Sequence, residues 1–565
     1  MSYSQTPSPV SVPGTSLSGR WVLLKQHLSA FALFKQPLSL LTLAIAALVL
    51  LPLGSLIFSW RDIQFDVWQH LVETQLAGLI WNTVVLVFGV ATGVAVLGTA
   101  LAALISLCEF PGRRWLEWAL MLPFAIPAYV LAFVYLGVFD FSGPLQGWMR
   151  QNIDGFTWVD IRSPLGVVTV LVLVFYPYVY MLARGAFQGQ GRSLYEASRL
   201  LGMSALRTFW RVTLPVARPA IIGGTVLAVM ETLADFGTVS VFNYDTFTTA
   251  IYKSWFGFFN LKAAAQLASV LLVFIVIFLV VEKQLKGRHS VAQSERQRIM
   301  PRQRLTGIQA WLASGFCGTV FVLAFLLPVI QLCWWVYTHA WNDFNARYAD
   351  LVLNTLLLAG FAALATVAAA SVLVLGGRFQ PGALSRFAER VGGLGYAMPG
   401  ALLAVAVMML FGFLDNEIIA PLQQWMGLPV EQLLLGSVIA LILAYLIRFL
   451  AVALKPVAHA FERVKPSMHE AARILGHSPF SVSLKVYLPL VMPGLLTAML
   501  LVFVDVLKEM PATLLMRPFG WDTLAVRIHE MTAEGEWERA ALPAISLIVA
   551  GMIPVIFLIR RSRVG

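Results

Sequence analysis

Residues 193–219 read SLYEASRLLGMSALRTFWRVTLPVARP, and residues 467–493 read SMHEAARILGHSPFSVSLKVYLPLVMP. The two stretches align without a gap, from Ser193 on Ser467 to Pro219 on Pro493. Both are polar and basic, and both lie between long apolar runs. Two such polar loops in a membrane protein are expected to lie outside the bilayer and to contact a partner in the aqueous phase. The duplication therefore predicts two related halves, each with its own contact loop.

The composition predicts an all-α polytopic membrane protein. The chain is 59% hydrophobic and 12% charged, and its mean hydropathy is +0.78, whereas soluble domains carry about 25% charged residues. In hydrocarbon every backbone polar group must be paired within the protein, so spans of about 20 residues should be helices. A β-barrel would instead show short alternating segments. Twelve spans are expected, at residues 40–59, 79–107, 116–139, 166–187, 218–242, 265–283, 308–338, 352–376, 392–414, 433–455, 490–516 and 541–561.

The distribution of charge predicts the orientation of these spans. With the N-terminus in the cytoplasm, most of the 40 Lys and Arg residues fall on the cytoplasmic side, including the basic stretch from Lys283 to Arg304. The loop 415–432, on the other side, carries three acidic residues and no basic one. This positive-inside bias places both duplicated loops and both termini in the cytoplasm. The net charge of +11 is therefore explained by the basic residues that orient the spans in the membrane, and no nucleic-acid partner is expected.

The duplication extends beyond the loops. Asn82-Thr83 matches Asn354-Thr355, and Ala125-Ile126-Pro127 matches Ala397-Met398-Pro399, both with the same offset along the chain. Two halves of six spans enter the membrane in the same orientation, which predicts a parallel pseudo-dimer about an axis normal to the membrane, with a transport path at its centre. The expected parts are a cytoplasmic N-terminal tail (1–38), disordered to about Gly19, a first six-span domain (39–283), a basic linker (284–307) and a second six-span domain (308–565). No cleavable signal precedes the first span, so that span is expected to remain as an anchor.

Each loop has the pattern of a helix–turn–helix at the membrane surface. Ser193 with Glu196, and Ser467 with Glu470, match the capping box that opens a helix. A glycine in the C′ position then ends that helix, Gly202 in one copy and Gly476 in the other. Ser204 and Ser478 are candidate N-caps for a second helix, and Leu-Pro pairs at 214–215 and 488–489 lead into the next span.

These loops resemble the EAA loop of binding-protein-dependent ABC importer permeases. The copies read Glu196-Ala197-Ser198 and Glu470-Ala471-Ala472, each followed by its glycine and by Pro215 or Pro489. The resemblance covers essentially the whole chain and implies two fused domains of the type I permease fold. In that family the loop forms a coupling helix that docks on a cytoplasmic ATPase, so the residues implied in coupling are Glu196, Ala197, Gly202, Pro215, Glu470, Ala471, Gly476 and Pro489. The alternative is a pair of amphipathic surface helices that merely end spans.

The resemblance also implies separate partners. The chain contains no G-x-x-x-x-G-K-[ST] sequence, so ATP and Mg²⁺ are expected on a separate ATPase, in two copies because there are two loops. The expected outside loops are too short for a solute-binding domain, which implies an external binding protein. We expect no cofactor and no enzymatic activity in this chain. The fused layout and the run from Glu231 to Phe256 resemble ferric iron permeases, while related permeases serve thiamine, polyamines or phosphonates.

Four acidic residues are candidates for the transport path. Glu231 and Asp235 are spaced i, i+4, so they are expected on one helix face, and Asp505 and Glu509 repeat the pattern at the equivalent positions of the second half. Ionisable groups at such depth pair with one another or line a wet cavity. Four carboxylates would suit Fe(III), which prefers oxygen ligands, with no permanent metal site. The alternative is structural, in which the acids pair with Lys508 or cap broken helices.

Two further readings remain open from the sequence. Pro123, Pro127 and Pro399 are expected to kink spans, either for gating or only for packing. A secondary transporter could also have two six-span halves, although it would need no duplicated docking loop. A membrane enzyme is disfavoured, because the loops show no nucleophile elbow and no H-E-x-x-H motif.

Overall fold

The protein is almost entirely helical, as the sequence predicts. A computed structural model describes residues 17–141, 143–154, 160–190, 192–286, 302–464, 467–468, 472, 474–476 and 479–562. The helices of the first half are α1 (Leu17–Phe58), α2 (Phe65–Thr74), α3 (Leu76–Leu107), α4 (Arg113–Ala119), α5 (Ala128–Phe139), α6 (Pro144–Asn152), α7 (Pro164–Gln188), α8 (Arg192–Leu200), α9 (Ala205–Thr208), α10 (Leu214–Ala234), α11 (Gly237–Val241), α12 (Phe247–Phe256) and α13 (Leu261–Lys286).

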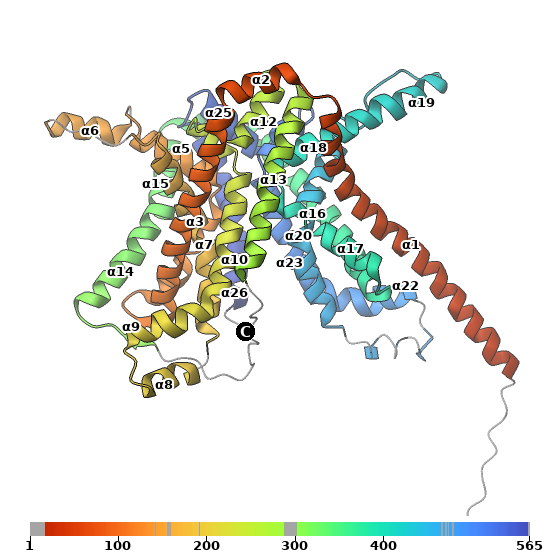
Figure 1. Ribbon diagram of the computed structural model, residues 1–565, viewed down its shortest axis with the longest axis horizontal. Coiled ribbons are helices and arrows are strands. Elements are labelled where there is room, and N and C mark those ends of the chain that lie inside the picture. The colour runs from red at the N-terminus through yellow and green to blue at the C-terminus, as the bar shows by residue number, and fades with distance from the viewer. Residues whose placement is uncertain are drawn as a thin grey trace, which may run out of the picture.

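The second half repeats this order. Its helices are α14 (Ile308–Phe321), α15 (Leu327–Trp335), α16 (Ala346–Phe379), α17 (Ala383–Gly392), α18 (Gly400–Leu414), α19 (Ala420–Trp425), α20 (Val438–Glu462), α22 (Pro479–Val482), α23 (Leu488–Leu507), α24 (Pro511–Met516), α25 (Leu524–Ala533) and α26 (Ala541–Ser562). The two halves approach each other at the upper side of the molecule and diverge toward the lower side, where α8 and α22 lie (Figure 1).

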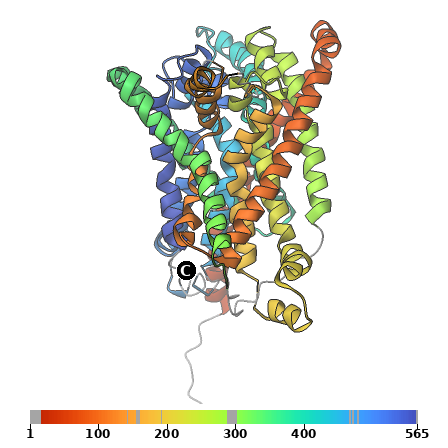
Figure 2. The ribbon, with the colours of Figure 1, turned by 90° about the vertical axis from the view of Figure 1, so that its left-hand side faces the viewer.

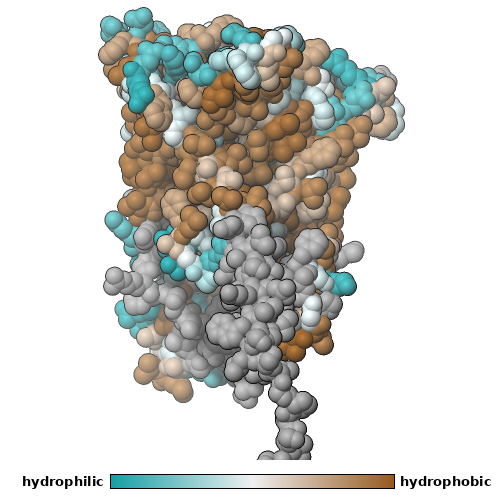
Figure 3. Space-filling model, turned by 90° about the vertical axis from the view of Figure 1, so that its right-hand side faces the viewer, coloured by the Kyte–Doolittle hydropathy of each residue, from teal (hydrophilic) through white to brown (hydrophobic). Residues whose placement is uncertain are grey.

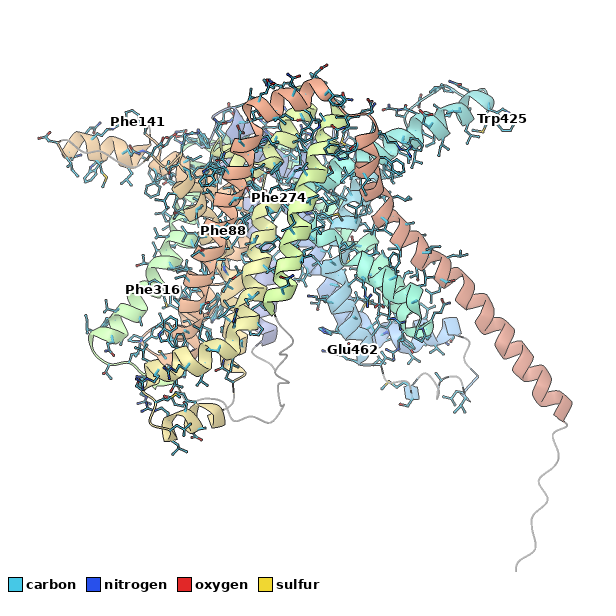
Figure 4. All side chains as sticks on the ribbon, viewed as in Figure 1. Phe88, Phe141, Phe274, Phe316, Trp425 and Glu462 are labelled. Carbon is cyan, nitrogen blue, oxygen red and sulfur yellow. The ribbon has the colours of Figure 1, made fainter. Side chains whose placement is uncertain are left out.

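Eleven helical runs in the described part of the chain are long and apolar enough to cross a bilayer, and α26 adds a shorter apolar stretch, Ala541–Ile553. Hydrophobic side chains cover the middle of the molecule, while hydrophilic ones gather at its upper edge (Figure 3). Phe88 and Phe316 point outward from this middle zone (Figure 4) and are 69% and 42% exposed. Such exposed apolar side chains are suited to contact with lipid, as in a multi-pass membrane protein.

The first span of each half packs on the opposite half. Helix α1 contacts α16, α17 and α18, and the Ser55 hydroxyl donates to the carbonyl of Ala406 at 2.9 Å. In return, the helix that begins with α14 lies obliquely across the first half (Figure 2). There the Tyr135 hydroxyl donates to the carbonyl of Leu323 at 3.0 Å. This exchange joins the halves through both of their outer faces.

The end of the linker is also fixed to the first half. Strand β1 (Cys108–Glu109) pairs in parallel with the short strand β2 (Gln303–Arg304), which lies near the end of the linker. The amide of Leu305 extends the ladder by donating to the carbonyl of Glu109 at 3.0 Å. The chain is therefore held against the first half before α14 begins.

Four predicted spans are broken rather than continuous. The spans 116–139 and 392–414 are interrupted before Pro127 and Pro399, whose φ,ψ values of −59°,143° and −55°,143° are extended. The preceding residues, Ile126 and Met398, are extended too, as expected before proline. The predicted kinks are thus full breaks, since proline cannot donate to the helix and restricts its neighbour. The spans 218–242 and 490–516 are likewise divided, between α10 and α11 and between α23 and α24.

The duplicated Asn-Thr pairs hold the loops that follow these breaks. The side-chain amide of Asn82 donates to the carbonyl of Asp245 at 2.9 Å, and that of Asn354 donates to the carbonyl of Gly520 at 3.1 Å. In the second half, the Thr355 hydroxyl also accepts from the amide of Leu524 at 3.0 Å. A pair repeated in the sequence therefore forms the same kind of anchor in both halves.

Proline also explains the wide turns inside several spans. Four π-helical turns each end two residues before a proline, at 209–213, 322–326, 415–419 and 483–487. A proline lacks the amide that an α-helix needs and its ring pushes the preceding turn open. Pro215 and Pro489 of the duplicated loops are two of these residues, so the Leu-Pro pairs widen the entry to α10 and α23.

Candidate functional site

A cavity of about 140 Å³ lies between the halves where the broken spans meet. All four predicted acidic residues line it, together with Arg448 and Lys508. Its remaining walls come from the breaks near Pro127 and Pro511 and from aromatic side chains of α7 and α20. The structure thus brings the four carboxylates to one place.

In the first half the two acids lie on different elements. Glu231 is in the last turn of α10, whereas Asp235 follows the helix with an extended φ,ψ of −68°,127°. The Asp235 carboxylate accepts from the Thr238 hydroxyl at 3.0 Å and from the amide of Val239 at 3.2 Å. The prediction that Glu231 and Asp235 share one helix face is therefore wrong, because the helix ends at Ala234. The alternative reading, in which an acid caps a broken helix, holds for Asp235.

The second half shows the same division. Asp505 lies in α23, while Glu509 lies between α23 and α24 and accepts from the amide of Ala512 at 3.1 Å. Glu509 is also paired with Arg448, whose Nε is 3.3 Å from its Oε2 and whose Nη1 is 3.3 Å from its Oε1. The shared helix face is wrong here too, and the partner of Glu509 is Arg448 rather than the expected Lys508.

Lys508 instead links the halves. Its Nζ donates to the carbonyl of Phe124, in the broken span of the first half, at 2.8 Å. Gly551 of α26 makes room for this side chain, since a Cβ there would lie 3.3 Å from the Lys508 Cε and 2.9 Å from the carbonyl oxygen of Ala125. The lysine therefore crosses the interface at the edge of the carboxylate cavity.

The basic residues make the cavity asymmetric. Arg448 and Lys508 both come from the second half, and their counterparts at the equivalent positions of the first half are Val174 and Ala234. Sequence reasoning missed Arg448, although a signal existed: it is a charged residue inside a span, opposite an apolar one in the other half. With four acids and two bases, the formal charge of the cavity lining is negative.

Gly400 accommodates the buried ion pair. A Cβ at this position would lie 2.2 Å from both the Arg448 Nη1 and the Glu509 Oε1, so any side chain would displace the pair. The first half has Ala128 at the matching position, directly after Pro127 as Gly400 directly follows Pro399. The half with Arg448 therefore has glycine at this position, and the half with Val174 has alanine.

The first duplicated loop has the predicted turn. Gly202 has a φ of +78°. Its amide donates to the carbonyl of Arg199 at 3.0 Å, and the amide of Met203 donates to the carbonyl of Ser198 at 3.1 Å, which is the Schellman arrangement. The Ser204 side chain accepts from the amide of Arg207, so its predicted N-cap role is confirmed. The predicted second helix of the loop is not a separate element, because residues 205–234 form one continuous span.

The second loop repeats the turn, with Gly476 at a φ of +82°. A Cβ on either turn glycine would meet nothing within 4 Å, so only the backbone conformation requires glycine there. Pro215 and Pro489 are the second residues of α10 and α23. Glu470, Ala471, Ser478 and the side chain of Ser193 lie outside the described residues, and with them the two predicted capping boxes. Glu196 and Ala197 are described and exposed on α8.

Ser198, where the first loop departs from the family pattern, has a specific partner. Its hydroxyl lies 3.1 Å from the Thr208 hydroxyl and donates to the carbonyl of Tyr195 at 2.7 Å. In the second loop the same two positions are Ala472 and Val482, both buried. A polar pair in one copy is thus replaced by an apolar pair in the other, and the packing between the loop helices is kept.

Among the described residues, no group of three His, Cys, Asp or Glu side chains is arranged to hold a metal ion. Asp235 and Glu509 are each engaged by a helix end, and Glu509 is also paired with Arg448.

Comparison with known proteins places the chain in a family. The model of the family "Binding-protein-dependent transport system inner membrane component" matches residues 95–283 and 362–563, and the chain belongs to this family. It is 28% identical over 498 residues to the Fe(3+)-transport system permease protein FbpB 2 of Haemophilus influenzae, covering 86% of this chain and 90% of that protein. It is thus a multi-pass inner-membrane permease subunit of a binding-protein-dependent transporter.

Two further relatives are named for different solutes. The ferric transport system permease protein FbpB of Actinobacillus pleuropneumoniae is 23% identical over 468 residues, or 77% of this chain and 64% of that protein. The sulfate transport system permease protein CysW of Escherichia coli K12 is 36% identical over 175 residues, or 31% of this chain and 58% of that protein.

The buried ion pair gives a first prediction. Arg448→Val should lower the free energy of unfolding by about 3–5 kcal/mol, because it leaves the buried Glu509 carboxylate without its partner. Arg448→Val combined with Glu509→Gln should recover most of this loss. Denaturant unfolding of the detergent-solubilised protein measures both. Equal instability of the single and double variants would show that the pair does not act as a unit.

Proposed function

We propose that this member of the binding-protein-dependent transporter family carries ferric iron across the inner membrane. The observation that carries the proposal is the cavity between the halves, where four carboxylates repeat in sequence and converge in space. Fe(III) is a hard cation that prefers oxygen ligands, and a negative field lowers the barrier to its passage. Similarity to ferric permeases over most of the chain supports the same solute.

The lining opposes an anionic solute. Sulfate would meet four acids against two bases, and Arg448, one of those bases, is already paired with Glu509. Thiamine and polyamines are cations and remain the alternatives with the same transporter class. Uptake measured with binding proteins loaded separately with ferric iron, thiamine, polyamine or phosphonate tests the choice. Uptake of another solute, with none of iron, would refute the iron assignment.

Within the cavity we assign different roles to the acids. Glu231 and Asp505 contact the solute, one from each half, whereas Asp235 and Glu509 chiefly hold the helix breaks. This division follows from the capping bonds of Asp235 and from the ion pair of Glu509.

The duplicated loops are proposed to dock two copies of a cytoplasmic ATPase that binds ATP and Mg²⁺. The apolar side chains before each turn glycine support docking, since Leu200 and Leu201 are 88% and 79% exposed and Ile474 and Leu475 are 86% and 77% exposed. Such pairs on a polar surface mark contact sites for another protein. An external binding protein delivers the solute to the opposite side.

The division of the acids gives a second prediction. Glu231→Gln with Asp505→Asn should sharply reduce iron uptake at near-normal folded yield, because charge is removed and volume kept. The control pair, Asp235→Asn with Glu509→Gln, should mainly lower the yield, because it leaves Arg448 unpaired. Uptake and detergent-extracted yield are measured together. The reverse pattern would exchange the assigned roles.

The loop turns give a third prediction. Gly202→Val with Gly476→Val should abolish uptake and ATPase association, because a β-branched residue at positive φ costs about 1–3 kcal/mol in each turn. Gly202→Asn with Gly476→Asn is the matched control and should keep both, since asparagine tolerates this conformation. Co-purification with the ATPase and uptake are the measurements. Normal coupling in the double Val variant would exclude the loops as docking sites.

The proposed orientation, with both termini in the cytoplasm, gives a fourth prediction. In a cysteine-free background, a cysteine at Ser294 of the linker should react with a membrane-impermeant thiol reagent only from the cytoplasmic side. A cysteine at the exposed Gln432 should react only from outside. Gln423 is less suitable, because it is 6% exposed and accepts from the amide of Glu431. Opposite sidedness at either position would invert the topology.

A further inference from the structure

Each half carries an arm that leaves the bundle sideways, on the upper side of the molecule, opposite to the docking loops. The first arm is made of residues 140–154, which include α6, and the second is made of residues 415–437, which include α19. Figure 1 shows α6 and α19 extending in opposite directions, and Figure 4 shows Trp425 at the far end of the second arm. No described residue of either arm lines the cavity between the halves.

The two arms share a sequence motif. Residues 144–149 read PLQGWM and residues 421–426 read PLQQWM, so the two copies differ at one position. The glutamine of the motif is buried in both arms. Gln146 donates to the carbonyl of the last residue of α5 at 2.7 Å, and Gln423 accepts from the amide of Glu431 at 3.1 Å. The glutamine therefore ties the helix of each arm to a neighbouring segment of its own half.

An acidic residue closes the base of each arm. The Asp140 carboxylate accepts from Nη2 of Arg162, just before α7, at 3.1 Å. The Asp415 carboxylate is buried and accepts from the amide of Leu435, just before α20, at 2.7 Å. The chain thus leaves and re-enters the bundle at one fixed point in each half. Each arm is a closed loop with a set direction.

The tryptophan of the motif is exposed in both arms. Trp148 is 58% exposed and Trp425 is 84% exposed, and the methionine that follows Trp425 is 50% exposed. Helix α19 contains no charged residue and α6 contains one, Arg150. In water, the exposure of such large apolar side chains on two arms of one protein is unfavourable. Tryptophan is instead typical of the boundary between lipid and water, where both its apolar ring and its polar N–H find partners.

The charged residue of α6 is arranged as in a helix at such a boundary. The Arg150 guanidinium lies over the Phe141 ring, with 3.7 Å between its Cζ and the ring centroid. Its Nη2 donates to the Phe141 carbonyl at 2.7 Å. An arginine that covers an apolar surface with its side chain and keeps its charge at a polar group can lie where lipid meets water.

The position of the arms also indicates lipid. Each arm follows directly on a helix that belongs to a membrane-crossing run, α5 or α18. The hydrophobic zone around the middle of the molecule ends at the upper edge (Figure 3), and the arms leave the bundle on that side (Figure 1). A protein that delivers a solute would contact the molecule near its centre, whereas the arms point away from the centre. The surface that surrounds the molecule at this level is that of the bilayer.

We propose that both arms lie in the headgroup region of the leaflet opposite to the docking loops. Trp148 and Trp425 insert at the boundary between the headgroups and the acyl chains. The partner is therefore the phospholipid surface, and the contact is independent of the solute that the protein carries. Two anchors on opposite sides of the molecule set the depth of both halves in this leaflet.

The experiment measures the depth of each arm with a fluorophore. In a cysteine-free background, Met149→Cys or Met426→Cys is labelled in the full transporter, which is then placed in phosphatidylcholine nanodiscs. Lipid with a nitroxide near the headgroup should quench both reporters severalfold more strongly than aqueous iodide or lipid with a nitroxide at the chain end. The matched control is Glu534→Cys, at the exposed residue that follows α25 on the same side. It should be quenched by iodide and not by either lipid.

The tryptophans are tested in the same reporters. Trp148→Asn beside Met149→Cys, and Trp425→Asn beside Met426→Cys, should lose most of the quenching by headgroup nitroxide and gain quenching by iodide. Unchanged quenching in both would overturn the assignment of the tryptophans as anchors. The reporters that keep both tryptophans decide the position of the arms even if an asparagine variant fails to fold.

Three results would overturn the proposal itself. Iodide quenching of both reporters at the level of Glu534→Cys, with no quenching by lipid, would place the arms in water. Quenching by lipid in one arm alone would exclude a common anchor. Iodide quenching that disappears when the external binding protein is added would assign the arms to that protein. No solute is used in the measurement, so failure of the iron assignment would leave its outcome unchanged.

Discussion

The structure depends on one constraint: inside a bilayer, an interrupted helix must find other partners for its backbone. Continuous helices satisfy this condition by themselves, but the protein breaks four spans. It places all four breaks against one another at the interface of the halves, where protein rather than lipid surrounds them. The acids at the breaks then have two uses. Asp235 and Glu509 accept hydrogen bonds from first-turn amides of α11 and α24, and with the other two carboxylates they line the small cavity that the breaks enclose.

Because the chain is duplicated, the two halves can be compared position by position. Where one half has Arg448 beside Glu509, the glycine at position 400 makes room for it, and where the other has Val174, alanine suffices. Where one loop has the Ser198–Thr208 pair, the other has two apolar residues. These exchanges preserve packing while changing polarity. The halves therefore share a common frame and differ in charge, which is how a symmetric scaffold comes to hold an asymmetric cavity.

Much of this was predictable from the sequence, for physical reasons. Span positions follow from hydrophobicity, the turn glycines follow from helix-end patterns, and the internal repeat pointed to all four acids. The breaks were expected only as proline kinks and as an open alternative for the acids, because an apolar run looks the same whether or not its backbone is continuous. As a result, the acids were expected on shared helix faces, whereas Asp235 and Glu509 lie beyond the helix ends. Arg448 matters through its contact with Glu509, which lies 61 residues away in the chain, and local patterns do not record such a contact.

The continuity of one helix in each half connects the two parts of the proposed mechanism. Just after the turn at Gly202, the chain runs without a break from Ala205 to Ala234, a span of 30 residues and so about 45 Å long. One end of this helix carries the docking loop, and Glu231 lies near the other. In the second half the continuous run Leu484–Leu507 carries Asp505 in the same way. A stiff helix transmits displacement along its length, so a movement that brings the two loops together also changes the separation of Glu231 and Asp505. In the proposed function, this helix connects the loop that docks the ATPase to the carboxylate that contacts the cation.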